Sequence, residues 1–240
     1  MNLKSRKIFL IGEESINDEL KSFLNGKAEF VSRLDNNTDI VIDTLNAHAG
    51  LKISNIEFID KHCSASIPVF TSSVCIPVSE LCASSKYPVR LIGIGLYNTF
   101  SKSGLIEIAP SKITDGNILG NAENFLNSSG ISYTKVPDRT GLVFPRIISM
   151  IINEAVQVYS EKTAAKEDID TAMKLGTSYP FGPLEWADRI GIDLVYDTLA
   201  SLYKFYGEDR YRPHPALREM VSLNMLGVKT GKGFYNYLNP

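Results

Sequence analysis

Few side chains in this sequence are of a type and spacing that could carry out chemistry. The three histidines, His48, His62 and His214, lie far apart, and none has a histidine or carboxylate at the spacing of a zinc motif. His62 falls near the end of a predicted helix, and His214 lies between two prolines that lead into the last helix. The sequence therefore predicts no metal site and leaves His48, which follows a predicted strand, as the histidine best placed to act in a reaction.

The cysteines give no sign of a disulfide or redox motif. Cys63, Cys75 and Cys82 are odd in number and show neither C-x-x-C nor metal-finger spacing. Such thiols are typical of a reducing compartment, and free cysteines usually pack as small buried residues. The N-terminal residues contain no apolar leader segment. We therefore expect a cytoplasmic protein with reduced thiols.

Composition and charge exclude several classes of protein. The 240 residues are 44% hydrophobic and 22% charged, close to the average of globular proteins. With 25 basic and 27 acidic side chains spread along the chain, the formal net charge is -2, so neither nucleic acid nor a membrane is an expected partner. The longest strongly apolar run, residues 147–152, is far shorter than the roughly 20 residues that cross a bilayer.

In the first half, short apolar runs alternate with segments of helical periodicity. This alternation predicts a parallel sheet covered by helices on both faces, an α/β arrangement. The predicted strands cover residues 7–12, 28–32, 39–44, 67–71, 89–95, 105–109 and 132–136, and the predicted helices cover residues 15–24, 51–62, 77–84 and 114–128.

The pattern changes after Pro137, and the second half shows helical periodicity only. Gly176 is predicted to end one helix as its C-cap, Pro183 to begin the next and Gly207 to end the one after. The sequence therefore predicts an α/β domain over residues 1–137 and an all-α domain over residues 138–240. The helices predicted in the second domain cover residues 142–161, 166–175, 183–190, 192–206 and 214–223.

Several ordered motifs in the second half resemble the C-terminal domain of 3-hydroxyacyl-CoA dehydrogenases. They are DIDTAMKLG at residues 168–176, YPFGPLE at 179–185, Asp188 with GID at 191–193, and GVKTGKGFY at 227–235, which is similar to the family's closing KTGxGFY signature.

The resemblance continues more faintly in the first half. DIVID at residues 39–43 is similar to the family's third-strand motif, and residues 93–107 align without a gap to its GxHFxNP...LVE segment. The resemblance implies a reduced Rossmann-like parallel sheet of the NAD-binding type, with little room for the helical hairpin that the family inserts between its second and third strands. A helical dimerisation domain would follow it.

The turn that would hold the cofactor departs from the dinucleotide-binding pattern. The G-x-G-x-x-G fingerprint uses glycines to bring backbone close to a pyrophosphate. Here the corresponding residues 12–17 read GEESIN, so only Gly12 is kept, and the carboxylates of Glu13 and Glu14 stand where a diphosphate would lie. We therefore expect no cofactor in the usual mode.

The family's catalytic residues are matched only in part. The histidine that takes the hydroxyl proton aligns with Gly95, whereas Glu107, which in the family pairs with that histidine, and Asn98 are kept. The family's substrate-orienting serine aligns with Val74, and the asparagine of its GFxxNR segment aligns with Pro145. The groups that a dehydrogenase needs are therefore missing together.

Two other side chains could replace the missing base. Cys75 directly follows Val74, although no basic residue nearby in the sequence would lower the pKa of its thiol. His48 follows the third predicted strand, close to where a cofactor would pass.

Two functions remain open at this point. The first is a non-catalytic binding or assembly protein, a pseudoenzyme homologue of the dehydrogenases. The alternative is an NAD-dependent 3-hydroxybutyryl-CoA dehydrogenase of fatty-acid metabolism with weak or altered activity. The expected partners are a second copy of the chain, through the largely apolar helix at residues 142–158, and an acyl-CoA.

Overall fold

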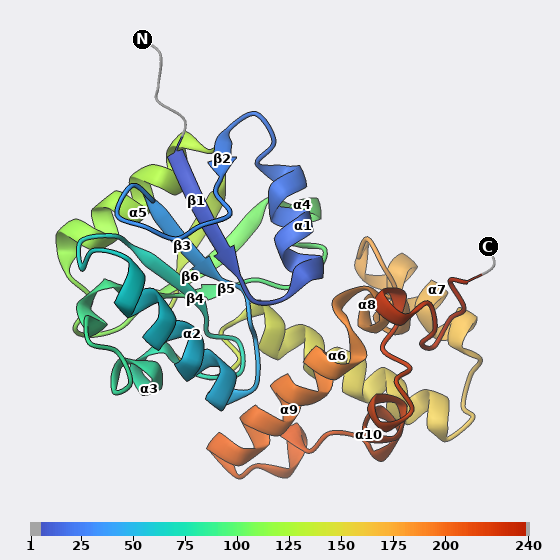
Figure 1. The fold of residues 1–240 in the computed structure, drawn as a ribbon. Coiled ribbons are helices and arrows are strands. Elements are labelled where there is room, and N and C mark those ends of the chain that lie inside the picture. The colour runs from blue at the N-terminus through green and yellow to red at the C-terminus, as the bar shows by residue number, and fades with distance from the viewer. Residues whose placement is uncertain (1–5, 239–240) are drawn as a thin grey trace. The chain divides into compact units, whose positions relative to one another are not determined.

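The computed structural model describes residues 6–238 and divides the chain into two compact units, with the division after Leu142. The first unit is a seven-stranded sheet with helices on both faces, and the second is a group of helices (Figure 1). The predicted order, α/β followed by all-α, is therefore confirmed. Among the described residues, no helix is long and apolar enough to cross a membrane.

The sheet has the strand order β2-β1-β3-β4-β5-β6-β7. All neighbouring strands are parallel except β5 and β6, which are antiparallel. The predicted Rossmann-like parallel sheet is therefore confirmed as a mostly parallel sheet with one antiparallel pair. The connection from Leu96 to Gly104 is too short for a parallel crossover, which needs about a dozen residues or more. The strands are β1 Arg6–Ile11, β2 Ala28–Phe30, β3 Ile40–Asp43, β4 Val69–Ser72, β5 Leu91–Gly95, β6 Leu105–Pro110 and β7 Ser132–Lys135.

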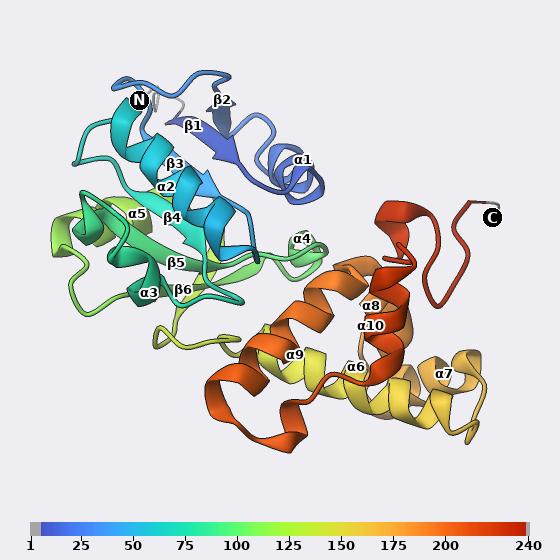
Figure 2. The ribbon, with the colours of Figure 1, turned by 60° about the horizontal axis from the view of Figure 1, so that its bottom comes forward.

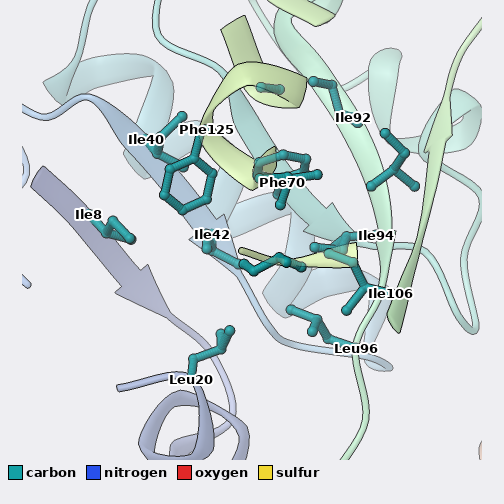
Figure 3. Packing of buried hydrophobic residues seen from close by; sticks show 14 of the residues in the cluster. Ile8, Leu20, Ile40, Ile42, Phe70, Ile92, Ile94, Leu96, Ile106 and Phe125 are labelled. Atoms are coloured by element: carbon teal, nitrogen blue, oxygen red, sulfur yellow. The ribbon is translucent and has the colours of Figure 1, made fainter. Parts of the chain in front are cut away.

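Two apolar clusters hold the helices of the first unit to the sheet. Alternate strand residues point to opposite faces, so Ile40 and Ile42 join one cluster with α1 and α5 (Figure 3). Val41 joins the other cluster with α2 and α3. The helices are α1 Glu14–Phe23, α2 Ala49–His62, α3 Val78–Cys82, α4 Phe100–Ser103 and α5 Gly116–Ser128, with a 3₁₀ turn at Pro88–Arg90.

The second unit is helical, as the sequence predicts. Helices α8 and α9 pack against α6, and α10 packs against α9 (Figure 2). The prediction that Gly176 ends α7 is wrong, because the helix continues to Thr177 and Ser178 takes the left-handed conformation with φ 57°. The elements are α6 Phe144–Ser160, α7 Lys166–Thr177, α8 Pro183–Ile190, α9 Ile192–Tyr206 and α10 Pro215–Ser222, with 3₁₀ turns at Asp209–Tyr211 and Val228–Thr230.

Candidate functional site

The candidate site lies in the first unit, where the loops that follow β1, β3, β4 and β5 meet at one edge of the sheet. Open α/β sheets bind ligands outside the carboxyl ends of their parallel strands, at the point where the strand order reverses. In this sheet β1 lies between β2 and β3, so that point is between the carboxyl ends of β1 and β3.

The position that aligns with the family's histidine has the backbone geometry for a His-Glu pair, and in this chain it packs against Leu142. Gly95 ends β5 and is paired in register with Glu107 of β6. A Cβ atom built at Gly95 would lie 3.7 Å from Oε2 of Glu107, so a side chain there would face the carboxylate. The same Cβ would lie only 2.9 Å from Cδ1 of Leu142, which is itself buried. A side chain at position 95 would therefore have to displace the terminal methyl group of Leu142.

Leu142 reaches this place through an unusual turn. The sequence predicts a helix that begins at Leu142, but α6 begins at Phe144. Gly141 and Leu142 instead both have positive φ angles, 82° and 48°. The N–H of Gly141 donates to the carbonyl of Val74 at 2.7 Å, which holds the turn against the loop after β4.

Val74 is part of the core rather than of a polar site. Its side chain is 0% exposed, so the position of the family's serine is filled by an apolar group. The hydroxyl of Ser73, one residue earlier, is buried and has no hydrogen-bond partner among the described residues. It packs over Gly93, at 2.5 Å from where a Cβ atom of Gly93 would lie.

Glu107 and its neighbours form an acidic, mostly buried group. Burial raises the pKa of the Tyr97 hydroxyl, and the carboxylates of Glu107 and Glu19 raise that pKa further. Glu19 of α1 also accepts hydrogen bonds from the backbone N–H groups of Thr99 and Ser101, at 2.8 and 3.0 Å. It thereby holds the segment after β5 that contains the half-buried Asn98.

The turn after β1 does not match the needs of a dinucleotide. Gly12 has a φ of 117°, and a Cβ atom there would lie 2.5 Å from the backbone N of Leu45. Contact with the loop after β3 therefore explains this glycine without a phosphate. Glu13 is the N-cap of α1 and Glu14 lies in its first turn, so two carboxylates already stand at the helix end that would attract a phosphate.

The adenosine side of the crevice departs from the pattern as well. NAD-binding sheets place an acidic residue after the second strand to bind the ribose hydroxyls. Here the residues after β2 are Val31, Ser32 and Arg33, and the last two are exposed. The chain's own residues therefore do not fit NAD in the usual mode.

A buried charged network follows β3, and the sequence analysis missed it. Lys52 and Asp43 are both 0% exposed, with Nζ of Lys52 lying 3.0 Å from Oδ2 of Asp43. Nζ also donates to the carbonyl of Leu45 at 2.7 Å and to Oγ1 of Thr71 at 2.9 Å. Burial lowers the pKa of Lys52, while Asp43 opposes this shift.

This network ties α2 to the sheet and does not present a reactive amine. Each N–H of the ammonium group has an acceptor, and Asn55 of α2 donates to Oδ1 of Asp43 at 3.0 Å. The signal in the sequence is the spacing of Lys52, Ile56 and Ile59, which places all three on the buried face of α2.

The two candidates for a replacement base have different surroundings. His48 is exposed at the N-cap of α2, has a left-handed φ of 62° and makes no side-chain capping hydrogen bond. Cys75 is buried directly after Val74. The other histidines have local roles: Nδ1 of His62 contacts the carbonyl of Phe58 at 2.7 Å, and Nδ1 of His214 accepts from the N–H of Ala216.

No metal centre is found within residues 6–238, where no three His, Cys, Asp or Glu side chains could hold an ion together.

Pro145 is the second residue of α6 and is buried, so at that position the ring takes part in packing in the second unit. Its missing N–H costs nothing in the first turn of a helix.

The signature motifs of the second unit surround two buried carboxylates. Asp188 of α8 accepts hydrogen bonds from the N–H groups of Phe234 and Tyr235, at 2.9 and 2.8 Å, and from the hydroxyl of Tyr237 at 3.1 Å. Gly233 packs so tightly on Asp188 that a Cβ atom there would collide with the carboxylate.

Asp170 of α7 plays the same part at the start of α8. It accepts from the N–H groups of Leu184 and Glu185, at 2.8 and 2.9 Å, and from the hydroxyl of Tyr235 at 2.8 Å. A Cβ atom at Gly182 would collide with Asp170. The motifs DIDTAMKLG, YPFGPLE and KTGxGFY therefore meet at two carboxylates that organise the unit.

Comparison with known proteins places the whole chain in one family. Residues 10–139 match the NAD-binding domain of 3-hydroxyacyl-CoA dehydrogenase, and residues 141–237 match its C-terminal domain. The 3-hydroxybutyryl-CoA dehydrogenase of Clostridioides difficile is 32% identical over 219 residues, which are 88% of this chain and 78% of that protein. A probable 3-hydroxybutyryl-CoA dehydrogenase of Bacillus subtilis is 33% identical over 203 residues, 83% of this chain and 69% of that protein.

A solved structure agrees with these matches. The crystal structure of (S)-3-hydroxybutyryl-CoA dehydrogenase PaaH1 from Ralstonia eutropha has a TM-score of 0.77 and 25% identity, over 98% of this chain and 99% of that chain. The Rossmann-like sheet followed by a helical domain is therefore confirmed, and the chain belongs to the 3-hydroxyacyl-CoA dehydrogenase family.

Proposed function

We propose that this chain is a member of the 3-hydroxyacyl-CoA dehydrogenase family that does not carry out the family's NAD-dependent oxidation and acts instead as a binding or assembly protein. The observation that supports the proposal is that Gly95, paired in register with Glu107, has no side chain to act as a base, while Leu142 packs against it. General base catalysis contributes about 10² to 10⁴ in rate, and it requires the base within hydrogen-bond reach of the proton.

The other missing groups support the same conclusion. A hydroxyl at position 74 and an amide at position 145 would orient the substrate, but valine and proline have no side-chain group for this purpose.

The test is the rate of NADH formation from 3-hydroxybutyryl-CoA and NAD by the purified protein. We expect no rate above background, and a turnover approaching about 1 per second, in the lower range of ordinary enzymes, would overturn the proposal. The variant Glu107→Gln identifies the source of any trace rate. Activity that belongs to this chain falls in the variant, whereas activity from a contaminating enzyme does not.

The comparisons favour a second candidate, an NAD-dependent 3-hydroxyacyl-CoA dehydrogenase with an altered site. In its favour are the match to the NAD-binding domain over residues 10–139 and the names of the relatives, which are 3-hydroxybutyryl-CoA dehydrogenases. Asn98 and Glu107 are kept in this chain. The same assay separates the two candidates, because only the second predicts turnover that depends on Glu107.

We also propose that the chain forms a homodimer through its second unit. On α6, Ile152 and Val156 are buried within the unit, whereas Ile147 is 54% exposed and Val143, just before the helix, is 47% exposed. An exposed apolar face of this kind is typical of an interface. Sedimentation at micromolar concentration should show a dimer for the natural chain and a monomer for Ile147→Asp, and a monomeric natural chain would exclude the proposal.

A further inference from the structure

We propose that the dinucleotide crevice of the first unit is closed by the chain's own side chains, so that NAD binding is lost independently of the catalytic groups. This inference deepens the proposed function and rests on it, but it concerns binding and is tested without turnover. It is drawn from the contacts between the turn after β1 and the loop after β3.

Thr44 joins these two segments across the switch point of the sheet. Its Oγ1 lies 2.8 Å from Oδ1 of Asn17, 3.2 Å from the carbonyl oxygen of Ile11 and 3.4 Å from that of Glu13. A hydroxyl has one hydrogen to donate, and the shortest distance assigns it to Asn17. The backbone N–H of Thr44 also donates to the carbonyl of Ile11, at 2.8 Å.

Asn17 is central because it stands at the third glycine of the fingerprint. That glycine normally lets the helix pack closely on the strand, whereas the second glycine, whose position Glu14 takes here, lets backbone approach the pyrophosphate. Here an amide side chain on α1 reaches the loop after β3, with Thr44 buried beneath it. The contact therefore joins the start of α1 to the loop after β3 at the switch point of the sheet.

The start of α1 carries negative charge of its own. The first intrahelical hydrogen bond runs from the N–H of Asn17 to the carbonyl of Glu13, so the N–H groups of the preceding three residues are the ones that a phosphate would use. Glu13 and Glu14 border these groups, and negative side chains are favourable at a helix start. A diphosphate would have to displace this favourable arrangement and approach two like charges.

The experiment restores a G-x-G-x-x-A turn and measures binding only. In the triple variant Glu13→Ala, Glu14→Gly and Asn17→Ala, the turn reads GAGSIA, and alanine is accepted at the third position of the fingerprint. NADH is titrated into the natural chain and the variant, with fluorescence enhancement and calorimetry as readouts. We expect no saturable binding to the natural chain up to about 1 mM, and a dissociation constant at least about tenfold below that limit for the variant.

A matched control variant separates the turn from a general change of charge. Glu57→Gly, Asn121→Ala and Glu154→Ala replace the same residue types at exposed helical positions outside the crevice, and this variant should bind no NADH. A second variant, Thr44→Ala with Asn17→Ala, removes the contact across the switch point while keeping both glutamates. It should bind NADH more weakly than the triple variant, because the two like charges remain.

Each outcome decides the inference. Micromolar binding of NADH by the natural chain overturns it, and so does a folded triple variant, checked by circular dichroism, that gains no affinity. Binding of NADPH but not NADH by the natural chain also overturns it and assigns the crevice to a phosphorylated dinucleotide held through Arg33. The proposed function fails separately, by turnover in the assay above, and binding without turnover would leave that proposal standing while this one fell.

Discussion

Each unit buries a carboxylate that belongs to a family motif, but the two carboxylates are held in different ways. Asp43, in the motif at residues 39–43, faces the ammonium group of Lys52. Asp188, in the second unit, is surrounded by two backbone N–H groups and the hydroxyl of Tyr237. Burial raises the pKa of Asp188, and these hydrogen bonds together with the charge of Lys166 oppose the rise.

The difference shows what each motif does in this chain. The carboxylate of Asp188 accepts hydrogen bonds from backbone N–H groups of the C-terminal segment, which has little regular structure of its own to satisfy them. The carboxylate of Asp43 joins α2 to the strands β3 and β4 at the carboxyl edge of the sheet. Both motifs are therefore explained by packing, and a motif match of this kind establishes the fold without establishing catalysis.

The largest expected effect comes from removing the cation at Asp43. Lys52→Met leaves a fully buried carboxylate without its counter-charge, which costs about 3 to 5 kcal/mol of stability. Hydrogen exchange of the β3 and β4 amides should show this loss within the first unit. Lys21→Met is the control, because its pair with Asp18 is exposed and should leave protection unchanged. Equal protection in both variants would mean that Asp43 is satisfied by its neutral partners alone.

Asp188→Ala should cost about 3 kcal/mol, since it leaves two backbone N–H groups and a hydroxyl without their acceptor. The measurement is denaturant unfolding followed by the single tryptophan, Trp186, which is buried on the same helix. Asp209→Ala, at an exposed pair with Arg212, should leave the midpoint unchanged. If the two variants unfold alike, the closing segment is held by its apolar contacts and the contrast with Asp43 disappears.

The positions of the strands and helices could be predicted because the apolar periodicity reflects burial directly. A continuous apolar run predicts a strand buried on both faces at Ile40, Val41 and Ile42, and all three side chains are buried in β3. Pro183 begins α8 and Gly207 follows α9 with a φ of 67°, as predicted. Apolar periodicity could not predict the antiparallel direction of β6. That direction depends on the length of the connection from β5 rather than on the residues of the strand.

The contents of the site were harder to predict, because they depend on residues that meet only in three dimensions. The sequence aligns Gly95 with the family's histidine, but the packing of Leu142 against Gly95 follows from a left-handed turn in the backbone. Lysine is a residue type that usually remains exposed, so Lys52 gave no sign of burial beyond its helical spacing. The hydrogen bond between Thr44 and Asn17 likewise joins two segments far apart in sequence.

Restoring the histidine alone should damage the first unit rather than repair it. Gly95→His forces a side chain against Leu142, and overpacking of this kind costs about 1 to 3 kcal/mol. Leu142→Ala opens the space at its own cost, so the double variant should be more stable than the sum of the single changes predicts, by about 1 kcal/mol or more. Denaturant unfolding of the four proteins gives this coupling. Additive effects would show that Leu142 moves aside and that the filled space does not exclude a base.

The smallest expected effect concerns the reactivity of the Cys82 thiol. It tests whether this thiol, like the carboxylate of Asp43, serves packing of the first unit. Burial raises the pKa of this thiol above its ordinary value of 9.0, and Asp138 raises it further, while Ser111 opposes the shift. A raised pKa means less thiolate at a given pH, and the thiolate is the reactive form. Alkylation of Cys82 in the folded protein, followed by peptide mass spectrometry, should therefore be slower at pH 8 than in the denatured protein. Its rate should still be rising above pH 9, where an ordinary thiol begins to level off. A rate that levels off below pH 9 would mean that Cys82 is an accessible, activated thiol and is not held for packing.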